Sequence, residues 1–117
     1  MASSSAKDRL QHMLKAMEGI ERLTTGKSLT EYQEAPDQAA AVERYLEIIS
    51  EASRHIPQDR LSEYPDIPWR QVADIGNVLR HAYERLDAKR VWKTVRTDLP
   101  PLKNAVQRML AELDEQP

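Results

Sequence analysis

The chain has 117 residues, a formal net charge of −2, no cysteine, no phenylalanine and only three glycines. The lack of cysteine excludes disulfides and thiolate metal sites, and abundant Ala, Leu, Glu, Arg and Lys favour helices over a sheet. No apolar run approaches the roughly 18 residues that a membrane span needs, and the N-terminus lacks the apolar core of a signal peptide. We therefore expect one all-α domain over residues 1–117, frayed over residues 1–6, in the cytoplasm and with no membrane partner.

The charges are unevenly distributed along the chain. Residues 1–66 carry 12 acidic and 8 basic residues, whereas residues 67–117 carry 7 acidic and 9 basic ones. Between residues 69 and 96, seven basic residues accompany only three acidic ones. A run of this kind most often marks a solvated helix face, and the alternative is a polyanion partner.

The first predicted helix runs from about Lys7 to Thr24. Its apolar residues recur at three- and four-residue steps, which places them on one side of a helix with 3.6 residues per turn. Gly26 then supplies a C-terminal stop. Ser28 and Glu31 have the spacing of a capping box, which predicts a short turn of helix after the first one.

The second long helix is predicted from Asp37 to about His55, after Pro36 and before Pro57. Residues 57–68 contain three prolines and no sustained periodicity, so they predict a connection with at most one helical turn. Loops of this length are often functional.

The central helix is predicted over Val72–Asp87 and has two kinds of face. Its apolar stripe, which we expect in the core, consists of Val72, Ile75, Leu79, Ala82 and Leu86. Its polar groups lie on two neighbouring stripes, with Asn77 and His81 on one and Gly76, Arg80 and Tyr83 on the other. An amide, an imidazole, a guanidinium and a phenol therefore share one side of the helix, and any chemistry is expected there.

The C-terminal part predicts a further helix, which Asp87 caps and which includes residues 91–95. Pro100 and Pro101 should kink or restart it, with Asp98 as the N-cap of the final segment. The buried residues of that segment are expected to be Leu102, Val106, Met109, Leu110 and Leu113. Four long helices with short links predict an up-and-down four-helix bundle with a kinked C-terminal helix.

Residues 67–106 resemble the signature of HepT-like proteins, which belong to the HEPN group of all-helical dimers. The family motif is an arginine followed directly by asparagine, then histidine, one residue and tyrosine. The matching residues are Asn77, His81 and Tyr83 in the motif, with Ile67, Pro68, Trp69, Val91, Trp92 and residues 98–103 around it. Gly76 stands where the family has its arginine.

The resemblance implies a two-fold homodimer and a metal-independent endoribonuclease toxin without a cofactor. It also implies a nucleotidyltransferase antitoxin that transfers AMP to the motif tyrosine, here Tyr83. His81 would be the acid or base, because an imidazole titrates near neutral pH, and Asn77 would orient it or the substrate. RNA fits and DNA does not, because only RNA has the internal 2′-hydroxyl nucleophile. Arg80, four residues after Gly76, is long enough to reach back into the space of the missing arginine.

In the nuclease interpretation, Arg85 and Lys89 of the basic run hold the RNA backbone. Two other interpretations stay open. In one, the catalytic pair is lost, and the protein binds the nucleotidyltransferase and is modified at Tyr83 without cleaving RNA. In the other, the protein is a helical dimer without chemistry, and His81 is a surface or interface histidine.

The remaining histidines and the tryptophans have simpler interpretations. His12 and His55 lack metal-ligand spacing to each other or to carboxylates, so we expect both on the surface or in loops. Trp69 and Trp92 are expected to be core or interface anchors rather than platforms for stacked bases.

Overall fold

The computed structural model describes residues 2–81 and 88–115, with side chains for residues 6–80 and 88–115. Every regular element in these ranges is helical, and no helix there is long and apolar enough to cross a membrane. The elements are α1 (Ala2–Thr24), α2 (Leu29–Gln33), α3 (Pro36–Ser53), α4 (Gln58–Leu61), α5 (Trp69–His81), α6 (Ala88–Lys93), the π-helical turn η1 (Thr94–Asp98) and α7 (Leu99–Glu115).

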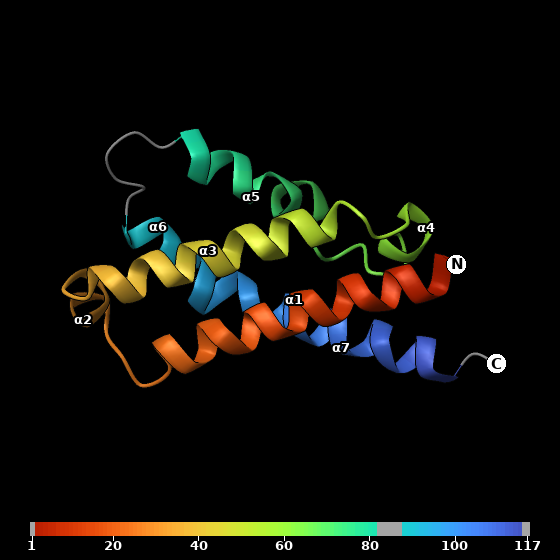
Figure 1. Cartoon of the computed structure of the whole chain (residues 1–117), viewed down its shortest axis with the longest axis horizontal. Helices are drawn as coiled ribbons and strands as arrows, with labels where there is room; N and C mark the ends of the chain where they lie inside the picture. Colours follow the sequence, from red (N-terminus) through yellow and green to blue (C-terminus); the bar gives the residue numbers. More distant parts are fainter. Residues whose placement is uncertain (1, 82–87, 116–117) are drawn as a thin grey trace.

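Four helical lengths run up and down through the described part of the chain (Figure 1). They are α1, α3, α5 and the continuous stretch of α6, η1 and α7. Helix α3 packs along α1 and also along α5, which lies at the upper edge in Figure 1, and α7 packs against α1. The predicted all-α, up-and-down four-helix bundle is confirmed.

The core lies where α1, α3 and α7 face one another. Complete burial of an aliphatic side chain contributes about 1.5–3 kcal/mol, so the predicted apolar stripes supply most of the driving force for packing. The largest fully buried apolar side chains are Leu10, Met13, Met17, Ile20, Val42, Leu46, Ile49, Val106 and Met109. All nine lie on these three helices, which confirms the helical periodicity in the sequence.

The predicted helix ends are largely confirmed by the capping groups. Gly26, two residues after the end of α1, has a positive φ of 78°, a conformation that glycine adopts at little cost. The capping box of α2 is complete, because the Ser28 amide donates to Glu31 Oε1 at 3.0 Å and the Glu31 amide donates to Ser28 Oγ at 3.1 Å. Helix α1 begins at Ala2, five residues before its predicted start.

The C-terminal helix differs from the prediction at Asp98. This residue is not an N-cap, because α6, η1 and α7 follow one another without a break and Asp98 is the last residue of the π-helical turn. The amide of Leu99 donates to the carbonyl of Thr94, five residues earlier. Pro100 and Pro101 have no amide hydrogens for the carbonyls four residues before them, and a widened turn accommodates this loss without ending the helix.

Helix α5 lies closer to the surface than predicted. Val72 is buried, but Ile75 and Leu79 of the same stripe are only half-buried against the core, while Ala82 and Leu86 lie outside the described residues. The stripe is incompletely covered because the main contact of α5 is with α3 alone. Asp87, the predicted cap of the next helix, also lies outside the described residues.

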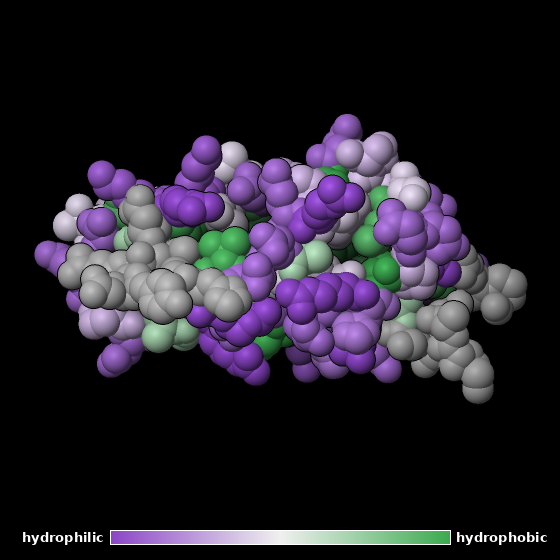
Figure 2. Space-filling model, turned by 90° about the horizontal axis from the view of Figure 1, so that it is seen from above, coloured by the Kyte–Doolittle hydropathy of each residue, from purple (hydrophilic) through white to green (hydrophobic). Residues whose placement is uncertain are grey.

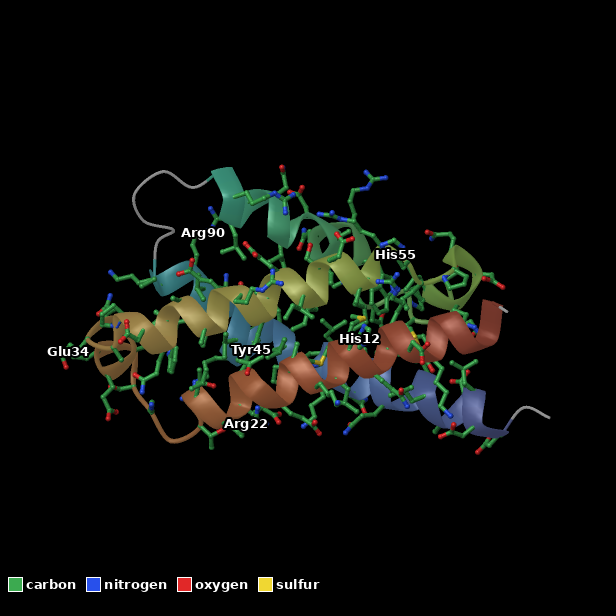
Figure 3. All side chains as sticks on the ribbon, viewed as in Figure 1. His12, Arg22, Glu34, Tyr45, His55 and Arg90 are labelled. Carbon is green, nitrogen blue, oxygen red and sulfur yellow. The ribbon has the colours of Figure 1, made fainter. Side chains whose placement is uncertain are left out.

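Helices α1 and α3 come close together at Gly19. A Cβ atom at this position would lie 2.5 Å from Cζ of Tyr45, which points from α3 toward α1 (Figure 3). Glycine is therefore required at this crossing by the tyrosine ring rather than by a turn.

We expect Gly19→Ala to lower the free energy of unfolding by about 1 kcal/mol, because displacing the Tyr45 ring outweighs the better helix propensity of alanine. In a Tyr45→Ala background, the same change should instead raise the free energy of unfolding, because only the propensity term remains. Denaturant unfolding of the wild type, the two single variants and the double variant measures both effects. A loss of stability in both backgrounds would show that the ring is not the obstacle.

Candidate functional site

The predicted site residues lie on the last turns of α5 and beyond. Asn77 and Arg80 are exposed on α5, and Lys89 is exposed on α6. His81 is the last residue of α5, and the structure describes its backbone only. Tyr83 and Arg85 lie outside the described residues. Asn77 and Arg80 are three residues apart on one helix, which makes them surface neighbours.

Gly76 is buried where α5 crosses α3. Its amide donates to Ser50 Oγ at 3.0 Å, and the same hydroxyl donates to the carbonyl of Ala73 at 2.7 Å. A Cβ atom at position 76 would lie 3.2 Å from Ser50 Oγ, which is tighter than an ordinary contact. The position where the motif has an arginine therefore faces a neighbouring helix in this chain.

The guanidinium group of Arg80 lies over Gly76. Its Nη1 is 3.2 Å from the place that a Cβ atom of residue 76 would take. Helical side chains lean toward the N-terminus, so Arg80 reaches back by one turn, as the sequence predicted. Among the described residues, no hydrogen bond or ion pair involves this guanidinium group. A positive charge therefore stands beside Gly76, while its catalytic role stays a prediction.

A second guanidinium group, from Arg54, reaches the same part of α5. Its Nε and Nη2 donate to the carbonyl of Ala73 at 3.1 and 2.8 Å, and its Nη1 lies 3.2 Å from Glu51 Oε2. A hydrogen bond from His55, together with nearby Arg54, lowers the pKa of Glu51. No sequence signal pointed to Arg54, because its partner is a backbone carbonyl 19 residues away on another helix.

A family model described as ribonuclease HepT-like matches residues 13–109. The chain belongs to this family. The match covers the motif region and all of α3 and α5, and it runs from the middle of α1 into α7. The sequence-based prediction of a ribonuclease of the HepT-like family is thereby confirmed.

Several relatives of the HepT-like chain share most of its length. It is 39% identical to a probable ribonuclease HepT of Thermococcus cleftensis over 105 residues, which cover 90% of this chain and 96% of that protein. It is 30% identical to a putative RNase of Methanocaldococcus jannaschii, over 98% of this chain and 99% of that protein. A putative RNase of Caldanaerobacter subterraneus is 28% identical over 86% of this chain and 90% of that protein. No solved structure matches the chain.

The face of this HepT-like bundle that carries α5 is largely hydrophilic (Figure 2). The exposed basic residues of α5 and α6 are Arg70, Arg80, Lys89, Arg90 and Lys93. Arg96 belongs to the same basic run but has a structural role. It donates to the carbonyls of Thr24 and Lys27 at the end of α1, and its guanidinium carbon lies 4.5 Å from the centre of the Trp92 ring. Not every positive charge of the run is therefore available to an anion.

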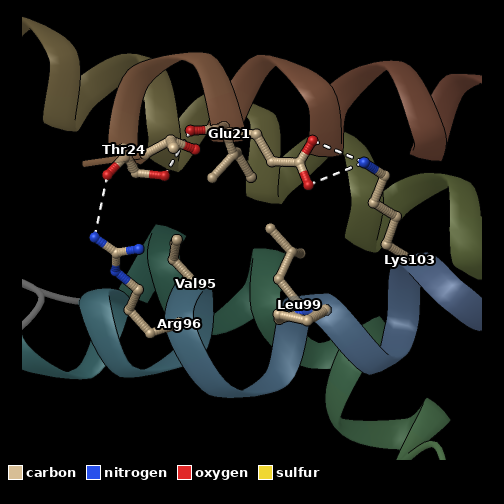
Figure 4. A pocket seen from close by; sticks show the side chains of 9 residues that line it. Glu21, Thr24, Val95, Arg96, Leu99 and Lys103 are labelled. Atoms are coloured by element: carbon tan, nitrogen blue, oxygen red, sulfur yellow. Dashed lines mark hydrogen bonds and ion pairs between the residues drawn. The ribbon is translucent and has the colours of Figure 1, made fainter. Parts of the chain in front are cut away.

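A pocket of about 150 Å³ lies between the end of α1 and the η1–α7 junction (Figure 4). Its charged groups already have partners: Lys103 Nζ donates to both carboxylate oxygens of Glu21 at 2.8 and 2.9 Å, and Arg96 holds the end of α1. None of its lining residues belongs to α5. The pocket is therefore separate from the motif, and its ion pair joins the first and last helices.

The remaining histidines and the tryptophans lie as predicted. His12 and His55 are exposed (Figure 3). The Trp69 indole is half-buried and donates to two backbone carbonyls of the connection before α5, at 3.0 and 3.1 Å. The Trp92 ring packs on Tyr32 with the ring centres 5.2 Å apart. Both tryptophans are anchors, and within the described ranges no cluster of three His, Asp or Glu residues could hold a metal ion.

Proposed function

We propose that the protein is a metal-independent endoribonuclease that acts in the cytoplasm. In this proposal His81 is the acid or base, Arg80 stabilises the phosphate, and Asn77 orients the imidazole or the substrate. The family match supports RNA as the substrate. The observation that carries the residue assignment is the Arg80 guanidinium over Gly76, next to the turn that ends in His81.

The proposed reaction uses the 2′-hydroxyl of the RNA itself. Its oxygen attacks the adjacent phosphorus, the bond to the 5′-oxygen of the next nucleotide breaks, and a 2′,3′-cyclic phosphate remains. A base takes the 2′-hydroxyl proton and an acid gives a proton to the leaving oxygen, roles that an imidazole can fill near neutral pH. Negative charge builds on the phosphate oxygens in the transition state, and the planar donors of an arginine match it. DNA lacks the nucleophile and should not be cut.

Arg85 and Lys89 are proposed to hold the RNA backbone, with the exposed bases of α5 and α6 extending that surface. Phosphate contacts of this kind release counterions, so binding should weaken as salt increases.

Arg80→Ala should lower the rate of RNA cleavage by roughly 10²–10³-fold, because a group that stabilises transition-state charge is removed. The matched control is Arg22→Ala, which removes one exposed arginine from α1 and should cleave at the wild-type rate (Figure 3). Cleavage is measured with purified protein and a labelled RNA. Wild-type cleavage by Arg80→Ala would remove Arg80 from the mechanism.

We further propose that the protein is the toxin of a toxin-antitoxin pair and is neutralised by AMPylation at Tyr83. The Tyr83 phenol oxygen would attack the α-phosphorus of ATP, pyrophosphate would leave, and the phenol proton would pass to solvent or a base. The new phosphate would place negative charge among basic residues and repel RNA by charge and bulk.

Incubation with the nucleotidyltransferase and ATP should add the mass of AMP to a peptide that contains Tyr83, as measured by mass spectrometry. Tyr83→Phe should remain unmodified, because it lacks the phenol oxygen. Modification of another residue, or of none, would contradict this route.

If Tyr83 is modified but the wild-type protein never cleaves RNA, the alternative holds: the protein binds a nucleotidyltransferase without being a nuclease. The glycine in place of the motif arginine is the observation that favours this alternative.

We also propose a two-fold homodimer. The support is the edge position of α5, which leaves Ile75 and Leu79 only half-buried on a helix that packs mainly on α3. A two-fold contact near α5 would cover these residues and create a cleft from two convex surfaces. Light scattering of the purified protein should give twice the chain mass of 13.5 kDa, and a monomer mass would contradict the dimer.

A further inference from the structure

We infer that the hydroxyl group of Ser50 is a positioning group for the proposed cleavage reaction. Ser50 lies on α3, and through Gly76 it holds in place the turn of α5 that carries Asn77 and Arg80. The inference rests on the proposed function. It concerns a residue that touches no substrate and that lies 26 positions before its partner in the chain.

Both hydrogen-bonding capacities of Ser50 are used in the contact with α5. The residue is fully buried, and its Oγ donates to the Ala73 carbonyl at 2.7 Å and accepts from the Gly76 amide at 3.0 Å. A hydroxyl group has one proton, so donation to Ala73 leaves its lone pairs for Gly76. Ala73 and Gly76 are three residues apart on one side of α5. Two bonds to this side limit both sliding and rotation of α5 against α3.

Glycine at position 76 makes room for this contact and for Arg80 at once. A Cβ atom there would lie 3.2 Å from Ser50 Oγ and 3.2 Å from Arg80 Nη1, and both distances are shorter than ordinary contacts. A Cβ atom at position 76 would therefore require Ser50 Oγ and the Arg80 guanidinium group each to shift by a few tenths of an ångström. The position of Arg80 depends in this way on Gly76, and the position of Gly76 depends on Ser50.

Arg54 provides a second attachment at the same carbonyl. Its Nε and Nη2 donate to Ala73 O at 3.1 and 2.8 Å, so α5 stays tied to α3 when the Ser50 hydroxyl is removed. Ser50→Ala is therefore expected to fold, with the turn after Ala73 less strictly placed. Ser53 offers a matched control, because it is also buried on α3, but its hydroxyl donates to the Ser50 carbonyl within its own helix.

Ser50→Ala should lower kcat for RNA cleavage roughly 10- to 100-fold with little change in KM, because a misplaced group chiefly weakens transition-state contacts. Ser53→Ala should stay within about twofold of the wild type. The double variant Ser50→Ala/Arg80→Ala should have nearly the same kcat as Arg80→Ala alone, because both changes remove the contribution of Arg80 to the transition state. Wild-type kcat for Ser50→Ala, or effects that multiply in the double variant, would overturn the inference.

A second variant tests the junction from the side of α5. Gly76→Ala should reproduce the loss of kcat seen in Ser50→Ala, because the added methyl group competes with Ser50 and with the Arg80 guanidinium for one space. Full activity of Gly76→Ala, with Arg80 still required, would contradict the inference.

Amide hydrogen exchange separates this inference from the proposed function. The Gly76 amide should exchange roughly tenfold faster in Ser50→Ala than in the wild type, because Ser50 accepts a hydrogen bond from it across the helix contact. In Ser53→Ala its exchange rate should equal that of the wild type. If the wild-type protein cleaves no RNA, the proposed function fails, whereas this exchange result still decides the Ser50 contact. Unchanged Gly76 exchange in Ser50→Ala would show that the hydroxyl does not hold this turn.

Discussion

The contact between α3 and α5 at Ser50, Ala73 and Gly76 determines where the candidate site lies. Helix α5 packs mainly on α3, so this one helix pair sets the place of the motif residues relative to the bundle. The contact is polar, with the Ser50 hydroxyl and the Arg54 guanidinium group meeting one carbonyl of α5. Directional hydrogen bonds specify a helix position more narrowly than apolar packing does, because small shifts weaken them quickly.

Helix α3 approaches both α1 and α5 at a glycine. On one side the Tyr45 ring faces Gly19 of α1, and on the other side Ser50 faces Gly76 of α5. Glycine serves the same purpose at both crossings, since it removes the Cβ atom that would otherwise separate the helices. Gly76 stands where the motif has its arginine, and Arg80 Nη1 lies 3.2 Å from the place that a Cβ atom of residue 76 would take. The same glycine therefore both differs from the motif and permits the close contact between α3 and α5.

Some basic side chains of the C-terminal half have structural contacts within the bundle. Arg96 caps the end of α1 and packs on Trp92, while Lys103 pairs with Glu21 to join α7 to α1. Neither is available as an open anion-binding group. The basic residues on α5 and α6 are exposed, and the face of the bundle that carries α5 is largely hydrophilic (Figure 2). Counting charges along the sequence therefore overstates the binding surface, because Arg96 and Lys103 already bind groups of the protein itself.

The sequence by itself determined the helices, the caps at Ser28 and Gly26, and the family. Periodicity, the Ser28 capping box and Gly26 act within a few residues, so local order along the chain was enough to predict them. The motif around Asn77 likewise identified a HepT-like ribonuclease before any contact was known. Only the tertiary structure decided that the chain passes Asp98 in a π-helical turn and that α5 lies at the edge of the bundle. It also decided that Ser50 and Arg54 hold the turn before Arg80, because such contacts depend on which helices meet.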